Sequence, residues 1–183
     1  YRRGGIQRPG TGEAVPVIFE EATAADYPAI LTLNQAAIPE VSHLDSQALA
    51  ALHRQAKLLT VARAEGTVAG FMLILTEGAD YGSLNYQYFA ERYDAFHYVD
   101  RIVVGENFRR QGVGAGLYEL LFEAAANAPR VTCEVNLRPP NPGSLRFHES
   151  LGFQVVGEQD TDGGEKRVAL MVRDNPTGIQ ANP

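Results

Sequence analysis

The sequence predicts a mixed α/β or α+β domain, in which strands form a sheet that is flanked by helices. The length of 183 residues is typical of one domain and is sufficient for a sizeable core. Apolar residues follow strand spacing in some segments and helix spacing in others, and the two kinds of segment alternate along the chain. Some successive strands are separated by a tight turn and others by a helix, which is typical of a mixed sheet.

The two ends of the chain differ in composition from the middle. Residues 1–16 contain four glycines and two prolines but almost no apolar periodicity. Such a stretch buries too little surface to offset the entropy lost on ordering, so we expect a flexible leader. Residues 174–183 are also rich in Pro, Gly and Asn and are expected to form a loose carboxy-terminal tail. The domain itself is therefore expected to span residues 17–173.

In the first half of this domain, residues that begin helices and turns separate the expected elements. Thr23 and Asp26 favour a helix start, and Asp45 or Ser46 can cap a second helix. Glu65-Gly66 is typical of a hairpin turn. The elements expected from these signals are a strand over 17–22, a helix that follows Asp26, a helix over 45–56, and hairpin strands over 58–64 and 67–75.

In the second half, strands again alternate with helices, and the apolar positions set their limits. Neither half contains an internal repeat or a low-complexity tract. The elements expected here are a strand over 96–104, a long helix over 112–127, a strand over 130–135, a helix over 144–151, and closing strands over 153–158 and 166–173.

The composition argues against several classes of function. The chain has 16 Lys and Arg against 22 Asp and Glu, and this net charge of −6 argues against sequence-independent binding of nucleic acid. No apolar run approaches the roughly 18–20 residues that span a bilayer, and no charged-then-apolar leader is visible. We therefore expect a soluble, cytoplasmic protein with no membrane partner and no secretory signal.

Cysteine and histidine show no pattern typical of a metal site. The one cysteine, Cys133, can form neither an intramolecular disulfide nor a Cys-rich metal site, and it favours a reducing compartment. Its apolar strand context predicts a small core residue rather than a nucleophile. The four histidines show no metal-ligand spacing, so no metal is predicted.

The strongest chemical signal lies in residues 103–115, where a strand leads into a helix. Gly112 and Gly114 lack Cβ atoms, so a ligand can approach the backbone closely. The first N–H groups of the helix have no partner within the helix, and the helix dipole adds positive potential there. Arg109 and Arg110 add cationic donors. The segment therefore suits a pyrophosphate, while the alternative is a tight connection with two solvent-facing arginines.

Two motifs resemble those of the GNAT superfamily of N-acetyltransferases. The family hallmark, Gln/Arg-x-x-Gly-x-Gly/Ala, is matched by Arg109, Gly112 and Gly114. The block over residues 141–153, Asn-Pro-Gly-Ser-Leu-Arg-Phe-His-Glu-Ser-Leu-Gly-Phe, is similar to the family's Asn-x-x-Ala-x-x-Leu-Tyr-x-x-x-Gly-Phe. The resemblance covers about residues 17–173 and implies a GNAT-like fold, a mixed, mostly antiparallel sheet flanked by helices in a single domain.

The resemblance also implies an acyltransferase that moves an acetyl group from acetyl-CoA, its cosubstrate, directly to an amine of a small molecule, amino acid or peptide. In that family the loop amides hold the pyrophosphate, and the preceding strand pairs with pantetheine and polarises the thioester carbonyl. Asn141 matches a residue that contacts the CoA arm, although a helix-capping role explains it equally well. The residues that would bind the cosubstrate are Ile102, Val103, Val104, Arg109, Arg110, Gln111, Gly112, Val113, Gly114, Ala115 and Asn141.

Two residues are candidates for proton transfer. Asp100 matches the position of a catalytic Glu in some GNAT enzymes, so we expect it to take up the proton of the acceptor amine. A structural ion pair, for example with Arg101, is the alternative for this residue. His148 stands where many relatives have a Tyr that protonates the departing thiolate. It can serve as that acid if neighbours such as Glu149 favour its protonated form, and otherwise it is a packing residue.

The acceptor side carries weaker signals. Seven of the sixteen Phe and Tyr residues lie between Tyr81 and Tyr98, with acidic residues among them. This segment predicts either an aromatic-lined pocket for a cationic amine, with Tyr81 and Tyr98 as contacts, or a core helix. His43 is a further candidate contact because the connection between the first two helices often meets acceptors in relatives, and a surface residue is the alternative.

Three hypotheses about function follow. The leading one is an acetyl-CoA-dependent N-acetyltransferase. The second is a non-catalytic acyl-CoA sensor with a GNAT-like fold, which the absence of the usual Tyr at position 148 keeps open. The third, an unrelated phosphoanion binder, leaves the block over 141–153 unexplained. GNAT relatives are often dimers, so the resemblance also implies a homodimer.

Overall fold

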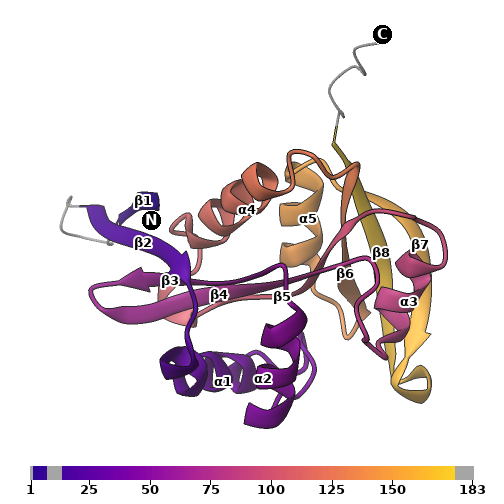
Figure 1. Ribbon diagram of the computed structural model, residues 1–183, viewed down its shortest axis with the longest axis horizontal. Coiled ribbons are helices and arrows are strands. Elements are labelled where there is room, and N and C mark those ends of the chain that lie inside the picture. Colours follow the sequence, from indigo (N-terminus) through magenta and orange to yellow (C-terminus); the bar gives the residue numbers. More distant parts are fainter. Residues whose placement is uncertain (1, 8–13, 176–183) are drawn as a thin grey trace, which may run out of the picture. The chain divides into compact units, whose positions relative to one another are not determined.

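The computed structural model describes residues 2–7 and 14–175 of the chain (Figure 1). This part contains eight strands, five α-helices and three short 3-10 helices. Side chains are described from Pro16 onward. Antiparallel pairs predominate among the strand registers described below, which also include a parallel pair. The predicted mixed, mostly antiparallel sheet is therefore confirmed. The chain divides into two compact units, Tyr1–Ile74 with Arg101–Glu123, and Leu75–Asp100 with Ala124–Pro183.

The first unit combines strands with three helices. Its elements are β1 (Arg2–Gln7), β2 (Ala14–Glu21), the 3-10 helix Ala24–Asp26, α1 (Tyr27–Ala36), α2 (Ser46–Gln55), β3 (Leu58–Ala64), most of β4 (Thr67–Thr76), the end of β5 (His97–Val104), the 3-10 helix Glu106–Phe108 and α4 (Val113–Ala124). The strand order is β1-β2-β3-β4-β5. Figure 1 shows α1 and α2 on one side of β3 and β4, and α4 on the other side.

Helix α4 lies unusually close to β2. A Cβ atom built on Gly116 would come within 2.4 Å of Cζ of Phe19, a distance that no real Cβ contact tolerates. Phe19 is itself buried, so its ring cannot simply turn out to solvent. Glycine is therefore required at this position for α4 to pack where it does.

The structure differs from the prediction at the amino-terminal end. Arg2–Gln7 forms β1, which pairs with β2 in a register that runs from Arg2↔Phe19 to Gln7↔Ala14. The expected boundary at 16/17 falls inside β2. The backbone hydrogen bonds of a strand pair do not depend on apolar side chains, so composition did not reveal this pair. The remaining residues of the expected leader, 1 and 8–13, lie outside the described residues.

The second unit contains the later strands of the chain and two helices. Its elements are α3 (Leu84–Ala90), the start of β5, β6 (Arg130–Arg138), α5 (Pro142–Ser150), β7 (Gln154–Thr161), the 3-10 helix Asp162–Gly164 and β8 (Lys166–Asp174). The strand order is β5-β6-β8-β7, and β5 and β6 form the parallel pair, with Tyr98 opposite Thr132. Figure 1 shows α5 beside β6 and β8, and α3 beside β7.

The expected boundary at 173/174 falls inside β8. Asp174 is the last residue of β8, and the Asn175 side chain donates hydrogen bonds to the carbonyl oxygens of Ala125 and Ala128, each at 3.0 Å. The ordered part of this unit therefore extends at least two residues beyond 173. The remaining residues of the expected tail, 176–183, lie outside the described residues.

Every element expected within 17–173 is present, with ends that differ by up to three residues. The helix expected at 144 begins at Pro142, because Asn141 caps it and proline fits the first helical position. The helix expected to reach 127 ends at Ala124. No helix within 2–7 and 14–175 is long and apolar enough to cross a membrane.

Candidate active site

Backbone and side-chain hydrogen bonds hold the connection from β5 to α4. The N–H group of Gly105 donates to the Ala69 carbonyl at 2.8 Å, which ties the end of β5 to β4. The Nε of Arg109 donates to the Val104 carbonyl at 3.3 Å, and the Gln111 amide donates to the Asn107 carbonyl at 2.6 Å. The loop therefore has a defined conformation in the first unit.

This conformation leaves backbone donors at the start of α4. Arg110 and Gly112 adopt positive φ angles of 59° and 88°, which reverse the chain direction ahead of the helix. The first α4 hydrogen bond runs from Gly116 N to Gly112 O at 2.9 Å, so the N–H groups of residues 113–115 precede it and have no acceptor within the helix. No acidic residue lies in the first turn of α4. Such a helix start attracts an anion.

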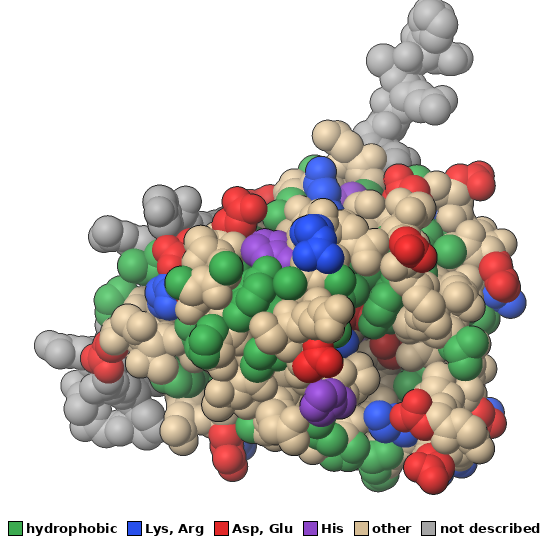
Figure 2. Space-filling model, turned by 60° about the horizontal axis from the view of Figure 1, so that its bottom comes forward, with side chains coloured by type: hydrophobic (Ala, Val, Ile, Leu, Met, Phe, Trp, Pro, Cys, Tyr) green, Lys and Arg blue, Asp and Glu red, His purple; other side chains and the backbone are tan. Residues whose placement is uncertain are grey.

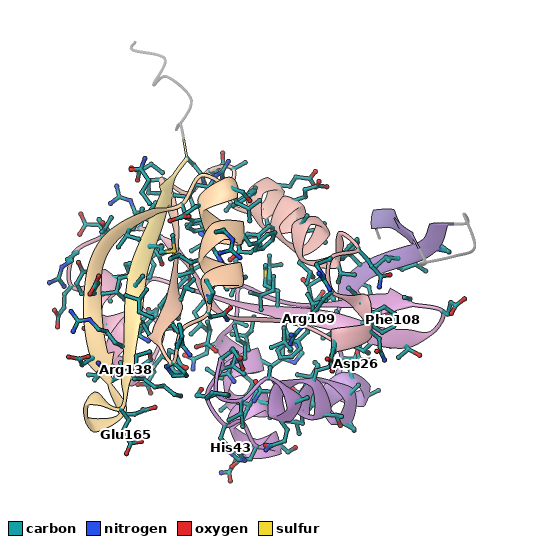
Figure 3. The ribbon with its side chains drawn as sticks, turned by 180° about the vertical axis from the view of Figure 1, so that it is seen from behind. Asp26, His43, Phe108, Arg109, Arg138 and Glu165 are labelled. Atoms are coloured by element: carbon teal, nitrogen blue, oxygen red, sulfur yellow. The ribbon has the colours of Figure 1, made fainter. Side chains whose placement is uncertain are left out.

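There is room for a ligand beside this loop. Nothing lies within 4 Å of a Cβ atom built on Gly112, and both Arg109 and Arg110 are exposed. Figure 3 shows Arg109 beside Phe108 in the segment that leads to α4. The donor set of backbone N–H groups and two guanidinium groups matches a diphosphate. The predicted pyrophosphate-binding residues therefore lie together at one helix start.

The end of β5 precedes the loop directly. Val103 is buried, while Ile102 and Val104 on either side of it are half-buried. This alternation is that of a strand with one face in the core. Ten of the eleven predicted cosubstrate residues thus lie in the first unit, along the single stretch 102–115.

Asn141, the eleventh, lies in the second unit and has a structural role. Its side-chain oxygen accepts a hydrogen bond from the Ser144 N–H at 3.2 Å and caps α5. The capping alternative is therefore observed. Asn141 is half-buried, so the cap accounts for its position in the fold without any ligand.

The aromatic segment forms a core in the second unit. Tyr86 is 3% exposed, and Phe89, Phe96 and Tyr98 are 0% exposed. Ring centroids lie 5.4 Å apart for Tyr86 and Tyr98, and 6.0 Å apart for Phe89 and Tyr98. For Tyr98, the structure therefore favours the core alternative over a pocket wall. Tyr81 is half-buried and contacts the edge of this cluster through Tyr86, with a centroid distance of 5.8 Å.

The buried Tyr98 phenol holds a carboxylate that the sequence analysis missed. Its hydroxyl donates to Glu134 Oε1 at 3.0 Å. Burial raises the pKa of Tyr98 well above 10, and the nearby charges of Glu134 and Asp100 raise it further. Tyr98 therefore stays protonated and remains a donor. Two carboxylates, Asp100 on β5 and Glu134 on β6, thus lie near one phenol.

A sequence signal for Glu134 does exist. It is a charged residue between the apolar Cys133 and Val135, and it shares a face with Thr132 because the two are separated by one residue. The sequence does not reveal the parallel strand register, which sets Thr132 opposite Tyr98. Without that register, nothing connects Glu134 with the segment around Asp100.

His148 is buried in the second unit and is 3% exposed. Its Nδ1 donates to the Ser144 carbonyl at 2.7 Å, and its ring packs edge-on against Phe147 and Phe153. Burial lowers the pKa of His148, although the bond to the Ser144 carbonyl opposes this effect. The imidazole is therefore neutral at pH 7. The protonated form that an acid role requires is disfavoured, and the packing alternative is supported.

His43 and Cys133, two further residues considered in the sequence, differ in exposure. His43 is exposed between α1 and α2 in the first unit (Figure 3), whereas Cys133 is buried. Among the residues described, no group of three His, Cys, Asp or Glu side chains is arranged to hold a metal ion. Figure 2 shows both basic and acidic side chains at the surface of the described residues.

Comparison with known proteins adds two findings. The model of the acetyltransferase (GNAT) family matches residues 20–153 of this chain. The search of curated proteins found no match to this chain.

Several solved structures are similar. Ribosomal-protein-S18-alanine N-acetyltransferase from Escherichia coli aligns with 91% of this chain and 99% of its own, at 18% identity and a TM-score of 0.69. Ard1 from Thermoplasma volcanium aligns with 86% and 97%, at 19% identity and a TM-score of 0.70. NAA60 from Arabidopsis thaliana, in complex with acetyl-CoA, aligns with 86% and 99%, at 17% identity and a TM-score of 0.68. At these identities the likeness establishes the fold alone.

Proposed function

Because the chain belongs to the acetyltransferase (GNAT) family, we propose that it is an N-acetyltransferase that uses acetyl-CoA. The acceptor is an amine of a small molecule, amino acid or peptide. The observation that carries the proposal is the β5–α4 connection. In it, exposed Arg109 and Arg110 come directly before the open turn at Gly112, and the first N–H groups of α4 follow that turn. This connection suits the diphosphate of acetyl-CoA.

The strand ahead of the loop supplies the remaining contacts in this proposal. The backbone of Ile102–Val104 pairs with the pantetheine arm, and a strand N–H stabilises the oxyanion that forms on the thioester carbonyl. The amine attacks that carbonyl, the bond to sulfur breaks, and the acetyl group forms an amide. The transfer is direct and needs no nucleophilic side chain, which agrees with the burial of Cys133.

The amine must lose a proton for this reaction, because an ammonium group has no lone pair. We assign this role to Asp100, which is half-buried on β5. Glu134 is the second candidate because Tyr98 holds its carboxylate in the same unit. Asp100→Asn is expected to lower kcat/KM about 100-fold or more if Asp100 is the base. An unchanged kcat/KM in Asp100→Asn, with a loss in Glu134→Gln, would transfer the role to Glu134.

The proposal is tested by calorimetry with acetyl-CoA and CoA, followed by measurement of free thiol released with a panel of amines. Peptides with amino-terminal alanine belong in the panel, because one similar structure is an alanine N-acetyltransferase. Absence of CoA binding would reject the proposal. Binding without thiol release across the panel would favour the acyl-CoA sensor. A cytoplasmic location, argued from the single cysteine, and a homodimer remain part of the proposal.

A further inference from the structure

Arg101 is a buried cation that contacts the connection between α1 and α2. It lies on β5 and is 4% exposed. Its Nη1 donates to Asn34 Oδ1 at 2.8 Å and to the Ser42 carbonyl at 3.3 Å, and its Nη2 donates to Ser42 Oγ at 3.1 Å. One guanidinium group therefore holds both a helix and the segment that follows it.

The three residues form a closed ring of hydrogen bonds. Asn34 on α1 is fully buried, and its Nδ2 donates to the Ser42 carbonyl at 3.0 Å. Ser42 thus accepts bonds through its backbone oxygen from both partners and through its hydroxyl from Arg101. A buried guanidinium that loses an acceptor is strongly destabilised, so the ring resists displacement of Ser42.

The residues after Ser42 are also anchored. The Leu44 side chain is 7% exposed. Asp45 caps α2, since its Oδ1 accepts a bond from the Ala48 N–H at 2.8 Å. His43 is exposed and stands between these fixed points (Figure 3). The backbone that carries the His43 side chain is therefore held on both sides.

We propose that Arg101 is a positioning residue for the acceptor amine. It holds segment 37–45 so that His43 is presented to the acceptor in one orientation. This inference rests on the proposed function and on the prediction from the family resemblance that His43 contacts the acceptor. Arg101 also directly precedes Ile102, the first residue of the proposed pantetheine strand. The same guanidinium therefore links the strand that holds acetyl-CoA to the segment that meets the amine.

The chemistry of arginine explains why this residue type is present. Its donors have a fixed planar geometry and reach two residues at once, whereas a lysine ammonium on a flexible chain does not reproduce this pattern. Arg101→Lys keeps the positive charge and removes the planar set of donors that contacts both Asn34 and Ser42. Ser42→Ala removes only the hydroxyl acceptor, and the Ser42 carbonyl and Asn34 Oδ1 remain as acceptors for Arg101, so its effect should be the smaller of the two.

The test compares these two variants with Arg63→Lys. Arg63 is a part-buried arginine of the same unit that pairs with Glu20 and Asp26 and does not contact segment 37–45 through these bonds. Arg101→Lys is expected to raise the KM of the acceptor about tenfold, and Ser42→Ala about threefold. The Kd of acetyl-CoA should change by less than about twofold, and kcat should be nearly unchanged. Amide hydrogen exchange at residues 41–44 should be faster in both variants, and neither effect should occur in Arg63→Lys.

The outcomes separate this inference from the function on which it rests. A wild-type protein that releases no thiol with any amine contradicts the proposed function. An active wild type whose acceptor KM is unchanged in Arg101→Lys, or is raised equally in Arg63→Lys, overturns the positioning role alone. Faster exchange at 41–44 together with a raised acceptor KM, confined to the two ring variants, supports it.

Discussion

The β5–α4 connection and helix α5 carry the two motifs of this chain, and they use their polar groups in opposite ways. In the connection, Arg109 and Arg110 are exposed and the N–H groups of residues 113–115 precede the first helical hydrogen bond. In α5, Asn141 caps its own helix and His148 donates to Ser144 one turn earlier. A ligand-binding motif must leave donors for the ligand. By this criterion the connection is a binding motif, and α5 is chiefly a structural one.

The largest expected effect is at Gly112. Its φ of 88° lies in the region that a valine avoids, so Gly112→Val should force the turn into another shape. Strain of this kind is expected to weaken acetyl-CoA binding by about 10–100-fold, measured by calorimetry. Gly143→Ala in α5 is the matched control, because nothing lies within 4 Å of a Cβ built there and its φ is not positive. Equal losses in the two variants would remove the contrast between the motifs.

The two exposed arginines should contribute the next largest effect. Replacing Arg109 and Arg110 together by Gln is expected to raise the Kd of acetyl-CoA about tenfold at low ionic strength, because two charged donors to the diphosphate are lost. The effect should shrink in high salt, where exposed charges are screened. Arg54→Gln, at an exposed arginine of α2, should have no effect. A double variant that binds as tightly as the wild type would contradict the diphosphate assignment.

A smaller effect is expected at His148. His148→Phe keeps an aromatic ring between Phe147 and Phe153 and removes the titrating group. We expect kcat to change by less than about threefold and its pH profile to keep its shape, whereas loss of a general acid typically costs 100-fold or more. A large loss of kcat in a folded variant would restore the acid role and give α5 a chemical function after all.

The same residue predicts a dependence of stability on pH. Burial lowers the pKa of His148 in the folded chain below its ordinary value of 6.5, so the unfolded chain binds this proton more tightly. The stability due to neutral His148 is therefore fully present above about pH 6.5 and is lost as the pH falls below it. The Tm measured between pH 7 and pH 5 should fall more in the wild type than in His148→Phe. Parallel curves would contradict a buried neutral imidazole.

Sequence reasoning placed the candidate site well where its geometry depends on contiguous backbone. Residues 109–115 form a strand-to-helix connection whose donors follow from helix geometry alone, so the structure places them as expected. It missed contacts between residues that lie far apart in the chain. The Tyr98–Glu134 bond joins residues 36 positions apart, and the Arg101–Ser42 bonds join residues 59 positions apart. Neither local spacing nor composition contains the strand register and loop path that create these contacts.

The helix elements show the same division. Asn141 and Asp45 were recognisable as caps because a cap acts on its own helix. The charge state of His148 was not recognisable, because it depends on burial, which lowers the pKa, and on the hydrogen bond to the Ser144 carbonyl, which raises it. His148 is 3% exposed, and the effect of burial prevails. Only the packed structure decides between two opposing effects of this kind.

The contact between Gly116 and Phe19 has a consequence for how this chain can change over evolution. A side chain at position 116 would push against a buried ring and move the start of α4, where the donors for the anion lie. Neither residue needs to touch a ligand for this to happen. A larger residue at 116 therefore becomes acceptable only after Phe19 has become smaller. Among related sequences, the two positions should vary together, with the substitution in β2 occurring first.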